Sequence, residues 1–223
     1  DAAPVSTLAE RLAAAVRDDT AAVLASTVLF GSSSVVPNVG AVMEAARRRG
    51  AQVLLDAYHG FGVVPFTLSA LGAEDAFLVG GGYKYAQWGE GVCFLRVPPA
   101  AAALRPVYTG WFVAFGHIAA PRSAGEVRYG QDGATRFAGS TYDPASHYRA
   151  RRVIRFFEEQ TLTVEKLAAG YRRQTGRLLA ALDGYEVRTP GEPSARGGFV
   201  AVAVANAEET VQRLRERARG GHQ

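Results

Sequence analysis

The sequence is poor in lysine and in cysteine. Only two of its 25 basic side chains are lysines, Lys84 and Lys166, and the others are arginines. Cys93 is the only cysteine, which excludes an internal disulfide and any metal site built from several cysteines. No apolar run approaches the roughly 20 residues that a membrane-spanning helix needs. The N-terminus also has no basic region followed by an apolar core, so we expect a cytoplasmic protein without a secretory signal.

The charge balance is basic, with a net charge of +4 and a pI near 9.4. Nucleic-acid binding is therefore one hypothesis for its function. However, the arginines occur in short groups within helix-like segments that also carry acids, and no nucleic-acid-binding motif accompanies them. This pattern favours solvated helix faces over a binding surface. The histidines lack the spacing of metal ligands, so we expect no metal site.

The first part of the chain alternates between strand and helix patterns. Near-continuous apolar strands separated by helices are typical of a parallel sheet that is covered on both faces. We therefore predict an α/β fold with a three-layer, mostly parallel sheet. The expected elements are a helix from a Thr7–Glu10 capping box to about Arg17, a helix that ends at Gly50, and strands at residues 21–29, 52–55, 76–80 and 92–97.

The second part of the chain is organised differently. Residues 108–146 are rich in glycine, aromatic and polar residues without clear periodicity, which indicates a long functional loop. Beyond it we predict a smaller α+β unit. Its expected elements are a helical region at residues 147–182 broken near Gly170, strands at 185–189 and 199–204, and a helix at 208–219. The predicted domains are thus residues 1–144 and residues 145–223, the second one incomplete.

Lys84 occupies an unusual setting for a lysine. It lies in an apolar, glycine-rich and aromatic segment, residues 78–85. An arginine cannot lose its proton in a protein, whereas a desolvated lysine can become a nucleophile. Upstream, a hydrophobic run ends on Asp56. One strand that ends in a carboxylate and a second that is followed by a lysine suggest a pyridoxal phosphate site. The lysine would bind the cofactor's aldehyde, and the aspartate would bind its pyridinium nitrogen.

Several polar side chains follow successive predicted strands. Thr27, Asp56 and Lys84 each fall at or near a strand's carboxyl end, where open parallel sheets bind their ligands. The hydroxyls of Thr27 and Tyr83 could bind a phosphate or orient a ring. His59, shortly after Asp56, could stack on the cofactor or hydrogen-bond near it. The sequence therefore predicts one site at this edge of the sheet.

Three motifs resemble the class V branch of the fold-type-I pyridoxal phosphate enzymes, and within it the kynureninase family. They are Asp-x-x-His-x-x-Gly at residues 56–62, Tyr-Lys-Tyr at 83–85 and Gly-Trp-Phe at 110–112. The resemblance runs from about Ala21 to Phe112, and more loosely to Arg219. It implies the fold of the pyridoxal-phosphate-dependent transferases.

The resemblance also implies roles for individual residues. Lys84 would be the Schiff-base lysine and Asp56 the partner of the ring nitrogen. The further cofactor contacts would be Thr27, His59, Tyr83 and Trp111. Trp111 would reach the cofactor phosphate of a neighbouring subunit, which implies a homodimer with a shared active site. The implied reaction is hydrolytic cleavage of the Cβ–Cγ bond of a kynurenine-like amino acid to alanine and an aromatic acid, a step of tryptophan catabolism.

The sequence departs from the family at the substrate end. Where the family has an asparagine in a Ser-Asn-Pro context, this chain has Thr141 within residues 139–144, so Thr141 is the candidate substrate contact. The family's carboxylate-binding arginine motif and its phosphate-binding loop have no counterpart here. We considered Arg196 as a carboxylate clamp, but an arginine before a strand is commonly a surface residue. The sequence therefore looks like part of a longer enzyme.

The sequence is also compatible with other functions. A class V aminotransferase or another β-carbon lyase would share the first chemical steps. A binding protein without a cofactor could use the same fold. A cysteine desulfurase is less favoured, because Cys93 follows Lys84 too closely to be a mobile nucleophile and is expected to be a small buried hydrophobic residue.

Overall fold

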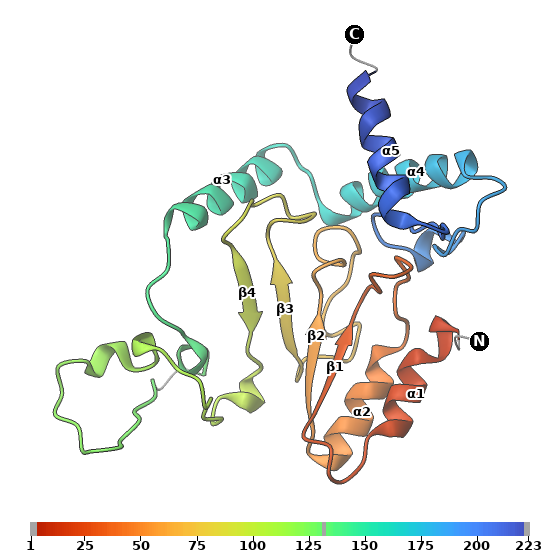
Figure 1. The fold of residues 1–223 in the computed structure, drawn as a ribbon. Coiled ribbons are helices and arrows are strands. Elements are labelled where there is room, and N and C mark those ends of the chain that lie inside the picture. The colour runs from red at the N-terminus through yellow and green to blue at the C-terminus, as the bar shows by residue number, and fades with distance from the viewer. Residues whose placement is uncertain (1–3, 131–132, 221–223) are drawn as a thin grey trace.

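A four-stranded sheet forms the centre of the protein in the computed structural model, which describes residues 4–130 and 133–220. The strands lie side by side in chain order and are β1 (Ala22–Ser26), β2 (Gln52–Asp56), β3 (Phe77–Gly81) and β4 (Cys93–Arg96). The first three are parallel and β4 is antiparallel to β3 (Figure 1). The prediction of an α/β fold with a mostly parallel sheet is confirmed.

Two helices pack on one face of this sheet. Helix α1 (Leu8–Ala15) contacts α2 (Val39–Arg49), and α2 contacts β1 and β2. Helix α2 ends at Gly50, whose positive φ of 68° is a conformation that glycine adopts without strain, as predicted. The core between the helices and the sheet is formed by buried apolar side chains, among them Val23, Val42, Met43, Val53, Leu55 and Leu78.

The opposite face of the sheet is open. Strand register places Ser26, Asp56, Val79 and Leu95 in one row across the four strands. Because side chains alternate along a strand, this row and Leu24 point away from the face that α1 and α2 cover. Leu24 is 69% exposed and Leu95 is 43% exposed. Asp56 therefore projects on the side of the sheet that has room for a bound molecule.

The N-terminal helix begins differently from the prediction. A 3-10 turn, η1 (Val5–Thr7), precedes α1. The Thr7 hydroxyl donates to the Pro4 carbonyl instead of capping the helix, and the Glu10 carboxylate accepts a 2.6 Å hydrogen bond from Asn38. The predicted capping box is thus wrong, because both of its side chains have found other partners.

After β4 the chain enters the irregular segment that the composition predicted. The 3-10 helix η2 (Pro99–Ala101) precedes the predicted range of residues 108–146, and η3 (Trp111–His117) and η4 (Thr135–Phe137) lie within it. Figure 1 shows most of this segment as a green lobe beside the sheet. The Phe137 ring contacts Phe77 at the start of β3, with 5.4 Å between the centroids. The lobe is therefore attached near the amino ends of the parallel strands.

The C-terminal part is mainly helical. Helices α3 (Ala145–Glu159) and α4 (Val164–Ala181) are separated by residues 160–163, so the predicted break at Gly170 is wrong and Gly170 lies inside α4. The strands predicted at residues 185–189 and 199–204 do not form. These two segments are joined by a single bridge pair, Val187 with Val202.

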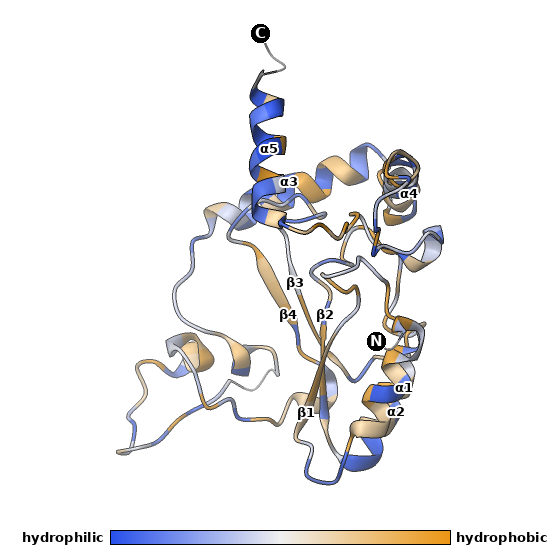
Figure 2. Cartoon of the chain, turned by 45° about the vertical axis from the view of Figure 1, so that its right-hand side comes forward, coloured by the Kyte–Doolittle hydropathy of each residue, from blue (hydrophilic) through white to orange (hydrophobic). Residues whose placement is uncertain are grey.

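The remaining elements are η5 (Pro193–Ala195) and α5 (Ala207–Gly220). Helix α5 is largely hydrophilic and extends away from the sheet (Figure 2). Across residues 4–130 and 133–220, the structure contains no helix with the length and apolar character needed to cross a membrane.

Candidate active site

Thr27 and Asp56 meet at the carboxyl edge of the sheet. The Thr27 amide donates a 2.8 Å hydrogen bond to the Asp56 carbonyl, and the Thr27 hydroxyl donates to the same oxygen over 3.2 Å. Thr27 is buried, and a Cβ on Gly60 would lie 2.8 Å from its hydroxyl oxygen. Thr27 thus holds the ends of β1 and β2 together, and its hydroxyl hydrogen is already used in that bond.

The Asp56 carboxylate is held by two further donors. Its Oδ2 accepts a 3.1 Å hydrogen bond from the Ser26 hydroxyl, and its Oδ1 accepts a 2.8 Å bond from the Tyr58 amide. These two hydrogen bonds fix the direction of the carboxylate. Ser26 was missed by the sequence analysis. The strand register could have found it, since Ser26 pairs directly with Asp56.

Lys84 follows β3 in a short aromatic turn. Its Nζ lies 5.4 Å from the centre of the Tyr83 ring, and that ring lies 5.8 Å from the Tyr58 ring. A Cβ on Gly81 would collide with both tyrosine rings. Glycine at the end of β3 therefore allows the two rings to approach the strand, one from the β2 loop and one from the Lys84 turn.

His59 lies between two phenylalanine rings. Its ring centroid is 5.3 Å from that of Phe30 and 5.2 Å from that of Phe199. Burial lowers the pKa of His59, the positive charge of Lys84 lowers it further, and the negative charge of Asp56 opposes both. The buried Nδ1 atom of His59 has no hydrogen-bond partner among the described residues. The His59 imidazole is thus close enough to Lys84 and Asp56 for both charges to affect its pKa.

Cys93 lies on the same open face of the sheet as Asp56. It is exposed, so the prediction that it is buried is wrong. The reason is that β4 is the last strand of the sheet and Cys93 points to the uncovered face. A hydrogen bond with Cys93, together with burial, raises the pKa of Tyr58 to about 12. Tyr58 is therefore a neutral phenol at physiological pH.

Trp111 and Thr141 belong to the lobe and not to this cluster. The antiparallel β4 carries the chain away from the carboxyl edge, and the lobe begins at the opposite edge (Figure 1). Within the lobe the two predicted residues lie near each other, because the Phe112 amide donates to the Gly139 carbonyl over 3.1 Å. Trp111 is 48% exposed and Thr141 is also exposed.

Arg196 is buried, with 5% of its surface exposed, so the prediction of a surface residue is wrong. Its guanidinium donates to the Thr175 hydroxyl over 2.9 Å, and to the carbonyls of Arg172 and Gly191. All of these acceptors are neutral. The guanidinium joins α4 to the loop before η5, and this use leaves its Nε and both terminal nitrogens occupied.

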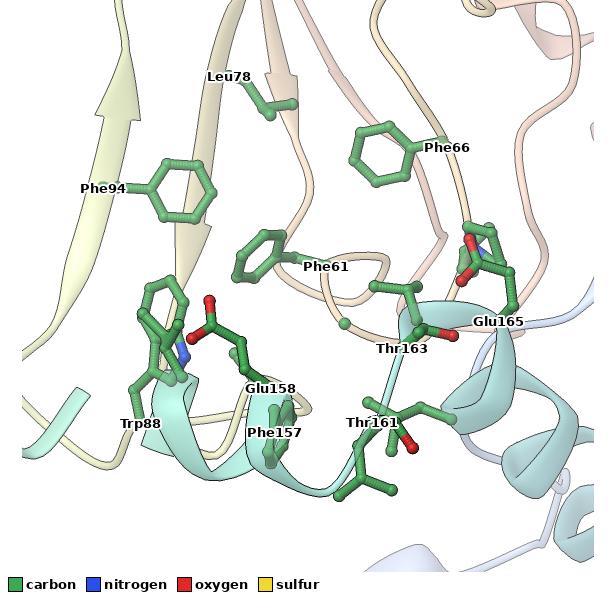
Figure 3. Close-up of a pocket in the computed structure, with 18 of the residues that line it drawn as sticks. Phe61, Phe66, Leu78, Trp88, Phe94, Phe157, Glu158, Thr161, Thr163 and Glu165 are labelled. Carbon is green, nitrogen blue, oxygen red and sulfur yellow. The ribbon is translucent and has the colours of Figure 1, made fainter. Parts of the chain in front are cut away.

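A cavity of about 1020 Å³ lies on the face of the sheet opposite to the Asp56 side chain, toward the junction of α3 and α4 (Figure 3). Its walls are mainly aromatic and aliphatic side chains, including Phe61, Phe66, Leu78, Trp88, Phe94 and Phe157. It takes in none of the predicted site residues. The candidate active site is therefore the polar cluster at the carboxyl edge and not this cavity.

Comparison with known proteins places the fold. A search of family models found no match. The kynureninase of Geobacillus thermodenitrificans (strain NG80-2) is 33% identical over 104 residues, which are 46% of this chain and 24% of that protein. The apo cysteine desulfurase of Thermococcus onnurineus NA1 superposes with a TM-score of 0.74 at 16% identity, over 96% of this chain and 50% of that one.

The cysteine desulfurase CsdA of Escherichia coli gives a TM-score of 0.69 at 15% identity, over 94% of this chain and 50% of that one. The chain has the fold of the class V pyridoxal-phosphate enzymes. It spans about half the length of these solved structures and a smaller share of the kynureninase. The predicted fold type is thus confirmed, and the activity of this chain is a separate question.

Proposed function

We propose that this protein binds pyridoxal phosphate and acts as a class V enzyme on an amino acid, with Lys84 as the residue that holds the cofactor aldehyde. The observation that carries the proposal is the joint placement of Asp56, His59 and Lys84 at one carboxyl edge. Kynureninases and cysteine desulfurases, the proteins to which the chain is similar, are pyridoxal phosphate enzymes.

The residues present suit this cofactor. An amine is needed for its aldehyde and a carboxylate for its ring nitrogen, and Lys84 and Asp56 supply them. The carboxylate is directed by Ser26 and by the Tyr58 amide onto the open face of the sheet. The charges of both Lys84 and Asp56 act on the pKa of His59, which supports the proposal that the three side chains form one site.

When bound, the cofactor supplies an electron sink for negative charge at the substrate's α-carbon. Asp56 would hold the cofactor's ring nitrogen in its protonated form. The Lys84 amine would act as the general base that removes the α-proton and returns it elsewhere. His59 and Tyr83 would lie beside the cofactor. These roles need only side chains that the edge already brings together.

For the substrate we propose a kynurenine-like amino acid. Water adds to its γ-carbonyl carbon and the Cβ–Cγ bond breaks, so that one substrate and one water yield alanine and an aromatic carboxylic acid. The three motifs at residues 56–62, 83–85 and 110–112 and the 33% identical kynureninase segment support this choice. Cysteine desulfuration is less favoured, because Cys93 is fixed in β4, opposite Gly81.

We further propose that a second copy of the chain completes the site. Trp111 lies with Phe112, Phe115 and Tyr142 in a cluster of aromatic rings on the lobe. Its indole is half exposed, and the lobe leaves the sheet at the edge opposite Lys84. A lobe from one protomer could present Trp111 and Thr141 to the Lys84 edge of its partner. The proposed assembly is a homodimer.

Borohydride reduction tests the cofactor assignment. The protein is incubated with pyridoxal phosphate, reduced, digested and examined for the labelled peptide. With two lysines in the chain the result is simple, and we expect label on Lys84 and none on Lys166. Lys166→Arg should keep the label and Lys84→Arg should lose it. Label on Lys166 alone, or no label, would refute the proposal.

Product analysis tests the reaction. The cofactor-loaded protein is incubated with kynurenine, 3-hydroxykynurenine or cysteine. Alanine with an anthranilate product supports the kynurenine reaction. Alanine with sulfide from cysteine, or keto-acid formation that requires an amino acceptor, would replace it by a desulfurase or an aminotransferase. Inertness toward all three, with Lys84 labelled, would refute the substrate class and leave the cofactor assignment standing.

Subunit complementation tests the shared site. Lys84→Ala and Trp111→Ala are each expected to be inactive alone. When they are mixed and allowed to exchange subunits, a mixed dimer carries one intact site, so about a quarter of the wild-type activity should return. Failure of the mixture to regain activity while mixed dimers are detected would contradict a site shared between protomers.

A further inference from the structure

The ring contacts of His59 connect the proposed cofactor site to the C-terminal part of the chain. Phe30 reaches His59 from the loop after β1, whereas Phe199 reaches it from the segment after η5. The two phenyl rings also contact each other, with 6.2 Å between their centroids. His59 is thus packed by residues that lie far apart in the sequence.

A functional histidine is usually oriented by a hydrogen bond on one of its ring nitrogens. His59 lacks that support at Nδ1, which is buried and has no hydrogen-bond partner among the described residues. Phe30 is 75% exposed and therefore packed on few sides, whereas Phe199 is partly buried. Packing against Phe199 is thus the firmer of the two ring contacts that fix the imidazole plane.

The backbone before Phe199 is itself held at the strand ends. The Val35 amide donates to the Ala195 carbonyl over 2.9 Å, and the Gly197 amide donates to the Ser33 carbonyl over 2.7 Å. The guanidinium of Arg196, between these two residues, binds α4. The segment is therefore tied to the β1–α2 loop on one side and to α4 on the other.

Two glycines let this segment approach the site closely. A Cβ on Gly197 would lie 3.0 Å from Val28 Cγ1, and a Cβ on Gly198 would lie 2.7 Å from the Tyr85 ring. Such distances are shorter than most real Cβ contacts, so a larger residue at either position would force a neighbouring group to shift. The path of the backbone up to Phe199 is thus fixed by contacts with the loops after β1 and β3.

We propose that Phe199 is a positioning residue that holds the His59 imidazole in place for the cofactor, so that the C-terminal part of the chain is coupled to the cofactor site. This inference rests on the proposed function for the cofactor itself. The packing of Phe199 on His59 does not depend on it. The charged groups that face His59 are Lys84 and Asp56, and neither is altered by a change at Phe199.

The test uses proton NMR of the four histidines in the cofactor-free protein, with the His59 signal assigned by its loss in His59→Gln. Phe199→Ala should raise the His59 pKa toward the ordinary value of about 6.5, because burial is the main cause of its lowering. Phe199→Leu should raise it less. The control Tyr185→Ala, which removes an exposed aromatic ring of the same region, should leave it unchanged.

The second measurement is the dissociation constant of pyridoxal phosphate. Phe199→Ala should raise it about two- to tenfold, the factor expected from loss of an aromatic pair. Gly197→Ala displaces the segment but keeps the Phe199 ring. It should also raise both the His59 pKa and the dissociation constant of pyridoxal phosphate. A circular dichroism spectrum like that of the wild type confirms that each variant is folded.

The outcomes separate the two proposals. Wild-type protein that binds pyridoxal phosphate at Lys84, with the His59 titration and the affinity unchanged in Phe199→Ala and Gly197→Ala, overturns this inference alone. Wild-type protein that does not bind pyridoxal phosphate overturns the proposed function and with it the role of Phe199 toward the cofactor. A raised His59 pKa with weakened cofactor binding in both variants supports the inference.

Discussion

The Ser26 hydroxyl donates a 3.1 Å hydrogen bond to Asp56 Oδ2, between two strands that end at the same edge of the sheet. The two residues are paired in the strand register, so their side chains leave the sheet on the same face. This bond and the one from the Tyr58 amide direct the carboxylate at the open side of the sheet. The position of Asp56 is thus set by the sheet and not by a flexible loop.

Ser26→Ala should therefore weaken cofactor binding without unfolding the protein. A hydrogen bond to a charged group contributes about 1.5–3 kcal/mol, so the affinity for pyridoxal phosphate should fall about tenfold or more. Absorbance titration with the cofactor measures it. Ser123→Ala, a change at an exposed position in the lobe, is the matched control. Equal affinities in the two variants would show that Ser26 has no part in directing Asp56.

His59 should make the stability depend on pH. Its pKa is lowered in the folded protein, mainly by burial, so below about pH 6.5 the unfolded chain binds a proton that the folded chain resists. Stability from this residue is present above that pH and is lost as the pH falls toward the folded pKa. Urea unfolding at about pH 7.5 and about pH 5.5 should show a larger loss in wild type than in His59→Gln. Equal losses would contradict the assignment.

The fold could be predicted where its signals are local. Apolar strands, the helix that ends at Gly50 and the acid at the end of β2 all follow from short stretches of sequence, and the structure places them as expected. The antiparallel direction of β4 could not be predicted in this way, because an apolar strand of this length fits either direction. The predicted strands at residues 185–189 and 199–204 form only one bridge pair, Val187 with Val202.

The site was predictable to the extent that strand ends meet at one edge. Thr27 and Asp56 are hydrogen-bonded there, and Lys84 is close enough to influence His59. Burial was harder to predict, because it depends on contacts between distant segments. Arg196 is buried because α4 and the loop before η5 close around its guanidinium. Cys93 is exposed because it lies on the last strand of the sheet.

Cys93 should react quickly with a thiol reagent in the native protein, because it is exposed at the last strand of the sheet. One equivalent per chain is expected, and denaturant should add none. Cys93→Ser should keep both the Lys84 label and the cleavage of kynurenine. Loss of activity with the label retained would instead give the thiol a chemical role and favour sulfur transfer from cysteine.

Arg196→Met should be among the more destabilising changes in the C-terminal part of the chain. The guanidinium is buried, and its removal leaves the Thr175 hydroxyl and three backbone carbonyls without their charged donor. We expect the free energy of unfolding to fall by about 2–4 kcal/mol, whereas surface changes usually stay within about 0.5 kcal/mol. Urea unfolding measures both.

Arg188→Met removes an exposed arginine nearby and serves as the matched control. Arg196→Lys keeps the positive charge and loses the planar fork of donors, so it should recover only part of the stability. Because Arg196 directly precedes the two glycines that lead to Phe199, Arg196→Met and Arg196→Lys should also lose affinity for pyridoxal phosphate. Unfolding energies of Arg196→Met and Arg188→Met that agree within error would show that the buried guanidinium does not join α4 to the site.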